Sequence, residues 1–183
     1  MTKTFAISDA HFHHANSLTF KRDDGSPMRS FSCVEEMDET MIQNWNRVVS
    51  SEDRVYFVGD FTMPRKGLEI LNRLNGRICV ILGNHDPWKL SDWMKYSPHK
   101  VDTLQGVKMF PKLGWILTHI PVHEDQFYGR WTCNIHGHTH WREKMKDGKI
   151  DPRYFNVSVE CIDYTPIEFE DLKSRIEERQ KSS

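Results

Sequence analysis

Short apolar runs alternate along the chain with segments whose apolar residues recur every three or four positions. The runs are rich in the valine, isoleucine, phenylalanine and tyrosine that suit a pleated surface. They predict strands at Thr4–Ser8, Arg54–Val58, Arg77–Leu82, Val107–Phe110, Gly114–Thr118, Thr132–Ile135 and Tyr154–Val159. Alternation of strands and helices is typical of βαβ units, so the pattern predicts an α/β fold with a largely parallel or mixed sheet.

Two helices are predicted between the first three strands. Apolar residues recur at helical spacing from Val34 to Val48, and Ser32 followed three residues later by Glu35 predicts a capping box at the start of that helix. The second helix is predicted over Pro64–Asn75, with leucines on one side and Gly76 as its stop.

Two further helices are predicted later in the chain. One covers Pro87–Tyr96, with proline at its first position and Trp88, Leu90 and Trp93 available for packing. The other is the strongly charged segment 165–181, which is expected to form a capped helix that docks as a tail.

Composition sets limits on the class of protein. The 183 residues predict a single domain over 1–183, with its core over 3–160. The 25 basic and 26 acidic side chains give a formal charge of −1, so no strong nucleic-acid binding is expected. No apolar run approaches the roughly 20 residues of a membrane span and no signal region precedes the first strand, so we expect a soluble, cytoplasmic protein that does not bind membranes. The oligomeric state stays open.

Histidine is the unusual feature of the composition, with ten residues that gather mostly at predicted strand ends. Polar residues follow five of the strands: Asp9 and His11; Asp60; Asn84, His85 and Asp86; His119; His138 and His140. Ligands of an open α/β sheet bind outside the carboxyl ends of its strands. Burying so many ionisable groups together is costly unless a cation holds the carboxylates and orients the imidazoles. The placement therefore predicts a metal site.

The ligand types narrow the choice of metal. Imidazole, carboxylate and amide ligands without thiolate suit Mn, Fe, Co, Ni or Zn rather than a thiolate-bound structural zinc. Seven of these side chains are candidate ligands: Asp9, His11, Asp60, Asn84, His119, His138 and His140. Seven ligands are too many for one tetrahedral ion, whereas two ions that share a carboxylate would use all of them. We expect two divalent metal ions, with manganese first and iron, nickel, cobalt or zinc as alternatives.

Five motifs in chain order carry a family resemblance. They are Asp9-x-His11, Gly59-Asp60, Gly83-Asn84-His85-Asp86, His119 and Gly137-His138-x-His140. Together they resemble the motifs of the calcineurin-like metallophosphoesterases, from about Phe5 to His140. The resemblance implies a four-layer α/β/β/α sandwich of two mixed sheets flanked by helices, and a compact phosphoesterase without a cap domain.

The resemblance also implies roles for these residues. One ion would be held by Asp9, His11, Asp60 and His140, and the other by Asp60, Asn84, His119 and His138. A hydroxide between the ions would attack phosphorus in line, because metal coordination lowers the pKa of bound water. His85 would protonate the leaving oxygen as general acid, with Asp86 holding its imidazole.

The substrate implied by the resemblance is a small phosphate ester or nucleotide, with phosphodiesters favoured over monoesters. The sequences that follow Gly59-Asp60 and Gly83-Asn84-His85 lack the patterns of serine/threonine protein phosphatases. His14, Asn16 and Arg142 are candidate substrate contacts, against the simpler readings of loop hydrogen bonds and solvated charge. Trp88, Trp131 or Trp141 could stack on a base, although most tryptophans are expected in the core.

Three alternatives stay open. A nuclease on longer nucleic acid is weakened by the balanced charge. A non-catalytic metal-binding scaffold of the same fold would be expected to lose ligands, and here every matched position is filled. An amidohydrolase or metallo-β-lactamase is disfavoured because the first needs roughly 250 residues and the motif after His11 does not fit the second.

Overall fold

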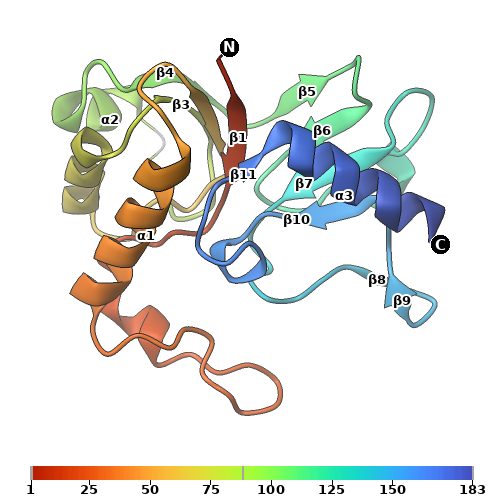
Figure 1. Cartoon of the computed structure of the whole chain (residues 1–183), viewed down its shortest axis with the longest axis horizontal. Helices are drawn as coiled ribbons and strands as arrows, with labels where there is room; N and C mark the ends of the chain where they lie inside the picture. The colour runs from red at the N-terminus through yellow and green to blue at the C-terminus, as the bar shows by residue number, and fades with distance from the viewer. Residues whose placement is uncertain (1, 88, 183) are drawn as a thin grey trace.

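The computed structural model describes residues 2–87 and 89–182, and its architecture rests on two mixed sheets (Figure 1). The five-stranded sheet consists of β11 (Ile167–Glu168), β1 (Thr4–Ile7), β2 (Arg54–Phe57), β3 (Arg77–Ile81) and β4 (Val101–Gln105), in that order. Strands β1 to β4 are parallel, and β11 runs antiparallel to β1. The α/β prediction is confirmed.

The four-stranded sheet holds the second half of the chain. It consists of β10 (Tyr154–Asn156), β7 (Cys133–His136), β6 (Trp115–Leu117) and β5 (Lys108–Phe110), with β5 antiparallel to β6. A separate hairpin is formed by β8 (Met145–Lys146) and β9 (Lys149–Ile150). All seven predicted strands are present, and the strand predicted to Val159 ends at Asn156. Strands β4, β8, β9 and β11 were not predicted.

Helix α1 (Val34–Val48) has the predicted bounds, but its cap differs by one residue. Cys33 is the N-cap, and its sulfur accepts a hydrogen bond from the Glu36 backbone N–H at 3.4 Å. The backbone N–H of Ser32 donates to the Glu36 carboxylate at 2.7 Å, and the Ser32 hydroxyl donates to the same oxygen. The predicted pairing with Glu35 is therefore wrong, because the helix begins one residue later than a Ser32 cap requires.

The second and third predicted helices are also corrected. The segment Arg65–Arg73 forms a 3₁₀ helix, η2, in which Leu68 and Leu71 are buried. Its leucines recur every three residues, the period of a 3₁₀ helix, in which side chains three apart are eclipsed. Helix α2 spans Leu90–Tyr96, so Pro87 does not begin it, and Leu90 is exposed while Trp93 is buried. Trp88 lies outside the described residues.

Helix α3 (Phe169–Lys181) follows β11 and runs along the four-stranded sheet, while α1 and α2 lie by the five-stranded sheet (Figure 1). The helix predicted over 165–181 therefore begins four residues later, after β11, and has no side-chain cap at its start. Its own residues Leu172 and Ile176 are buried, so it docks on the rest of the chain. The Phe169 ring lies 5.7 Å from the ring of Tyr56 in β2 and 5.5 Å from that of Trp115 in β6. Helix α3 therefore joins the two sheets. Short 3₁₀ turns η1 (Ala15–Leu18), η3 (Glu124–Gln126) and η4 (Val159–Cys161) complete the structure.

The two sheets are also joined at their carboxyl ends. Ser8, directly after β1, donates its backbone N–H to Val157 and accepts from the N–H of Val159, at 2.9 and 3.1 Å. This places the residues that follow β1 beside the residues that follow β10. Among the described residues, no helix is long and apolar enough to cross a membrane.

Candidate metal centre

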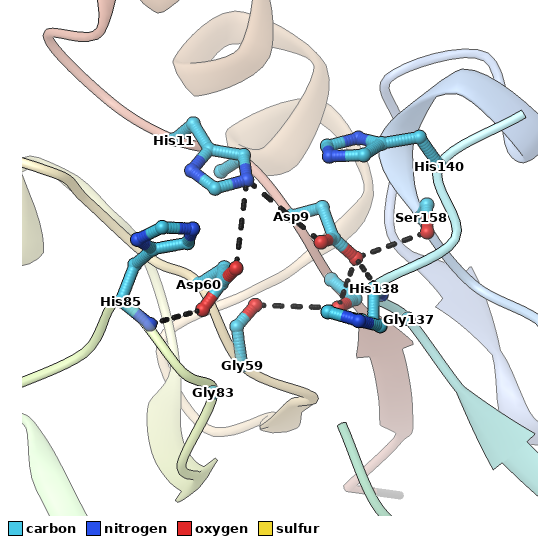
Figure 2. A network of polar contacts seen from close by, with 12 residues as sticks. Asp9, His11, Gly59, Asp60, Gly83, His85, Gly137, His138, His140 and Ser158 are labelled. Carbon is cyan, nitrogen blue, oxygen red and sulfur yellow. Dashed lines mark hydrogen bonds and ion pairs between the residues drawn. The ribbon is translucent and has the colours of Figure 1, made fainter. Parts of the chain in front are cut away.

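The carboxyl ends of β1, β2, β3, β6 and β7 deliver the predicted ligands to one place. Figure 2 shows Asp9, His11, Asp60, His138 and His140 among them. His11 Nε2 lies 3.8 Å from Asp9 Oδ1 and 3.6 Å from Asp60 Oδ2. His119 Nε2 lies 3.3 Å from Asp60 Oδ2 and 3.1 Å from Asn84 Oδ1. The ring of His140 stacks 5.3 Å from that of His11, and His138 lies 5.2 Å from His119. Segments far apart in the sequence thus meet in one cluster.

The backbone at these positions has an unusual conformation. Five of the predicted ligands have a positive φ: Asp9 at 57°, His11 at 50°, Asp60 at 58°, His138 at 68° and His140 at 50°. This left-handed conformation costs a residue other than glycine about 1–2 kcal/mol. Such strain persists only where the surroundings impose it, and it gathers at functional sites.

Glycines in the motifs are required by close packing under the cluster. A Cβ atom at Gly83 would collide with the Asp60 carboxylate, and one at Gly137 would collide with Ser8 and the Asp9 carboxylate. The glycines that precede Asn84 and His138 therefore let the two strand ends approach the carboxylates.

The Asp9 carboxylate divides its two oxygens between protein and site. Its Oδ2 accepts hydrogen bonds from the Ser8 hydroxyl at 2.6 Å, the Ser158 hydroxyl at 2.9 Å and the backbone N–H of His138 at 2.9 Å. Its Oδ1 is buried with no hydrogen-bond partner among the described residues. A buried carboxylate oxygen without a partner is costly unless a cation binds it. One oxygen of Asp9 is therefore fixed, and the other is available for a metal.

Two imidazoles are held so that Nε2 faces the cluster. The Nδ1–H of His119 donates to the Val58 carbonyl at 2.9 Å, and Nδ1 of His140 lies 3.1 Å from Glu160 Oε1. A carbonyl can only accept, so His119 carries a proton on Nδ1. Hydrogen bonding of one ring nitrogen to a carbonyl or carboxylate fixes the tautomer and orientation of metal-binding histidines.

Glu160 and Arg29 are parts of the site that the sequence analysis missed. Both side chains are fully buried, and Arg29 contacts Glu160 Oε1 through Nε and Nη2, each at 2.7 Å. The same guanidinium donates to the backbone carbonyls of Asp9 at 2.6 Å and Ala10 at 2.8 Å. Arg29 therefore fixes the strained turn at Asp9 and, through Glu160, the ring of His140. Their signal in the sequence is weak, because they lie in a polar loop and a short turn outside the motifs.

The electrostatics follow from burial and pairing. Burial lowers the pKa of His11 to about 3, so its imidazole is uncharged at neutral pH and can act as a metal ligand. Burial alone would lower the pKa of His119, but its contact with Asp60 outweighs burial and raises the pKa to about 9. Burial likewise opposes ionisation of Glu160, but the charge of Arg29 prevails and lowers its pKa to about 2. A metal at the cluster would displace the Nε2 proton of His119.

His85 and Asp86 do not form the predicted pair. The His85 ring is exposed and lies 5.6 Å from the ring of His11, at the mouth of the cluster. Asp86 is buried, and its carboxylate accepts from the backbone N–H groups of Gly83, Asp60 and Phe61 at 2.8–2.9 Å. Asp86 thus ties the loop after β3 to the loop after β2. The prediction that Asp86 holds the His85 imidazole is wrong. The Asp86 side chain is buried against backbone N–H groups, whereas the side chain of its neighbour His85 is exposed.

The predicted substrate contacts lie at different distances from the cluster. The His14 ring lies 5.7 Å from that of His11, and its Nδ1 is buried without a hydrogen-bond partner among the described residues. Asn16 is exposed in η1. Arg142 forms an exposed ion pair with Asp23 and stacks on the ring of Trp141 at 4.5 Å. Only His14 is brought directly against a predicted ligand.

Two groups of side chains could each hold a cation. They are Asp9, His11 and His140, and Asp9, Asp60 and His119, with ligand atoms within 4.8 Å of one another. The unpartnered Asp9 oxygen and the oriented imidazoles fit a divalent ion bound by nitrogen and oxygen ligands. The described residues thus contain carboxylate and histidine groups that could bind a metal.

Comparison with known proteins places the chain in a family. It is 37% identical to the uncharacterized protein MJ1445 of Methanocaldococcus jannaschii over 188 aligned residues, covering 97% of this chain and 93% of that protein. The chain belongs to the MJ1445 family. It is also 28% identical to the Gene 66 protein of Mycobacterium phage L5, over 76% of this chain and 78% of that protein. No family model matches the chain.

One solved structure shares the fold of this chain. The protein of unknown function AQ665 from Aquifex aeolicus superposes with a TM-score of 0.69 at 26% identity, over 95% of this chain and 99% of that chain. The phosphopantetheinyl hydrolase PptH from Mycobacterium tuberculosis gives a TM-score of 0.43 at 14% identity, over 86% and 89% of the two chains. The first of these shows a shared fold.

Proposed function

We propose that this protein is a metal-dependent phosphoesterase with the four-layer α/β/β/α fold of the calcineurin-like enzymes. Its substrates would be small phosphate esters, with phosphodiesters or nucleotides favoured. The observation that carries the proposal is the strained backbone of five residues that follow three separate strands and meet in one cluster. Beside them lies a buried Asp9 oxygen with no hydrogen-bond partner among the described residues.

Two ions are proposed, with Asp60 between them. Asp9, His11, Asp60 and His140 would hold one, and Asp60, Asn84, His119 and His138 the other. Both geometric groups contain Asp9, but its Oδ2 already accepts three hydrogen bonds, which leaves one oxygen for a metal. Asp60 Oδ2 instead lies 3.6 Å from His11 Nε2 and 3.3 Å from His119 Nε2. We therefore assign the shared ligand to Asp60.

The chemistry divides between the ions and the chain. Bound divalent ions would lower the pKa of coordinated water and neutralise charge on phosphoryl oxygens. Asp9 and Asp60 supply the negative charge that holds them, and Glu160 and Val58 orient the imidazoles of His140 and His119. His85 stands exposed at the mouth of the cluster, where its ring can give a proton to the leaving oxygen.

A metal titration tests the proposal. Chelated protein is assayed with bis-p-nitrophenyl phosphate and p-nitrophenyl phosphate, then again after addition of Mn, Ni, Co, Zn or Mg, with bound metal measured alongside. We expect two ions per chain and turnover restored by metal, faster with the diester.

Asp60→Ala is the decisive variant, because loss of a shared carboxylate removes ligands of both ions. We expect loss of bound metal and of turnover together. Asp125→Asn, at a side chain that is 80% exposed, serves as the control and should behave as wild type. Full activity of Asp60→Ala would contradict the two-ion site, and absence of bound metal in wild-type protein would favour the scaffold alternative.

A further inference from the structure

A small cavity adjoins the cluster on the side of Asn84 and His119. Its volume is about 230 Å³, and it lies between the segments that follow β3, β4 and β6. Asn84 and His119 form one end, while Leu82, Gly106 and Ile120 line the remainder. Two residues of the proposed metal centre, Asn84 and His119, thus also form part of the cavity wall.

Among the described residues, the lining has no charged side chain besides the titratable ring of His119. The remaining polar side chain, Thr118, is already satisfied, because its hydroxyl donates to the Ile120 carbonyl at 2.7 Å and accepts from Asn134 Nδ2 at 3.0 Å. The end away from the proposed ligands is therefore apolar, with no group that would favour a charged or strongly polar guest.

The walls of the cavity are partly open. Ile120 is 55% exposed, although large apolar side chains usually bury most of their surface. A Cβ atom at Gly106 would meet nothing within 4 Å, so empty space lies above that glycine. An apolar group that entered from the cluster would cover Ile120 and fill the space beside Gly106.

We propose that this cavity binds an uncharged organic substituent of the phosphate ester, such as a small aromatic ring, while the phosphoryl group lies at the metal centre. The inference rests on the proposed phosphoesterase function and adds the substrate class: esters with a compact apolar substituent rather than a charged or extended one. At about 230 Å³ the cavity has room for one ring.

The test measures binding of phosphonates, in which a P–C bond that a phosphoesterase does not hydrolyse replaces the ester bond. Metal-loaded protein is titrated calorimetrically with inorganic phosphate, methylphosphonate and phenylphosphonate. We expect phenylphosphonate to bind roughly tenfold more tightly than methylphosphonate, because the ring leaves water for an apolar wall.

Two variants probe the cavity in opposite ways. Gly106→Leu fills it, so phenylphosphonate should lose its roughly tenfold advantage while methylphosphonate affinity stays unchanged. Ile120→Ala removes an exposed wall without touching the core, and should reduce the same advantage about threefold. Ile150→Ala is the matched control, since Ile150 is 45% exposed and lies in β9, away from the cavity lining.

The outcomes separate this inference from the proposed function. Equal affinities for the two phosphonates in wild type, or variants that leave the ratio unchanged, would overturn the cavity assignment while the metal centre stands. If no phosphonate and no phosphate bind the metal-loaded protein, the phosphoesterase proposal itself fails, and the cavity assignment with it.

Discussion

The strained residues of the cluster are held in place by hydrogen bonds between the two strand ends. The N–H of Asp9 donates to the Gly59 carbonyl at 3.0 Å, and that of His11 donates to the Asp60 carbonyl at 3.1 Å. These bonds join the turn after β1 to the turn after β2, and both turns carry positive φ angles. The chain therefore holds an unfavourable local conformation that aims Asp9, His11 and Asp60 at one point.

His138 offers a direct measure of this strain. His138→Gly removes the Cβ that disfavours a φ of 68°, whereas His138→Ala keeps it. In chelated protein we expect the glycine variant to be more stable than the alanine variant by about 1 kcal/mol, from urea unfolding. Elsewhere in ordered structure glycine is the less stable of the two, so an alanine variant of equal or higher stability would contradict strain at this position.

Glu160 should act on the metal through His140. In Glu160→Gln the side chain can still accept a hydrogen bond from the ring but has lost its charge, so we expect Mn²⁺ affinity to fall about tenfold, measured by calorimetry. Glu143→Gln is the control, because Glu143 forms an ion pair at 2.8 Å with Arg179 of helix α3 and is not among the proposed ligands. An equal loss of affinity in both variants would indicate a general effect on folding instead.

His85→Ala should separate chemistry from metal binding. The variant should keep normal metal content but turn over roughly 10²-fold more slowly, most for alkyl esters whose leaving oxygen needs a proton. His99→Ala, at an exposed histidine that the motifs do not include, controls for loss of an imidazole. Rates of a series of esters check the role, and an equal loss across leaving-group pKa values would refute it.

At the scale of elements, the sequence predicted the helices and strands with a regular apolar pattern and the positions where these strands end. It did not predict the directions of individual side chains or the strands with few apolar residues. Helix α1 and all seven predicted strands follow from the pattern of apolar residues, and α1 and every one of these strands except β5 contain buried residues. Strand β4 was missed because its sequence, VDTLQ, has polar positions and none of its residues is fully buried. The strand ends also located the cluster of candidate ligands. The direction of Asp86 and the partners of Glu160 depend on tertiary contacts that no local pattern encodes.

Asp53 ties the start of β1 to the turn before β2. Its buried carboxylate accepts from the N–H groups of Lys3 at 2.7 Å and Ser50 at 2.8 Å, and from the Ser50 hydroxyl. Burial raises its pKa, but these donors prevail and hold the pKa below its usual 3.8. The carboxylate therefore stabilises the fold above about pH 4, and this contribution is lost as the pH falls below that value.

Asp53→Asn should lower the free energy of unfolding by about 2 kcal/mol at pH 7, because the amide cannot accept all three hydrogen bonds. The difference from wild type should shrink as the pH falls below 4. Urea unfolding across pH 3–7 measures this, with the exposed Asp125→Asn as control. A difference that is constant across that range would exclude the ionised carboxylate as its source.

At the scale of the whole molecule, the cluster lies across the junction of the two sheets. Asp9, Asp60 and Asn84 follow strands of the five-stranded sheet, while His119, His138 and His140 follow strands of the four-stranded sheet. Two kinds of hydrogen bond cross this junction directly. The backbone of Ser8 bonds to those of Val157 and Val159, and the backbone N–H of His138 donates to the Asp9 carboxylate. Any ion bound by both sets of ligands would cross-link the sheets and would offset repulsion between the Asp9 and Asp60 carboxylates.

Metal binding should therefore stabilise the whole domain and not only the loops that hold it. A ligand that binds only the native state at 100 times its Kd adds about 2.7 kcal/mol, which for a domain of this size raises Tm by roughly 5–10 °C. We expect Mn²⁺ to produce this shift and a chelator to reverse it. Asp60→Ala should show no shift, because both ions lose a ligand, whereas Asp125→Asn should match wild type. A wild-type Tm insensitive to every divalent ion tried would contradict a metal that joins the two sheets.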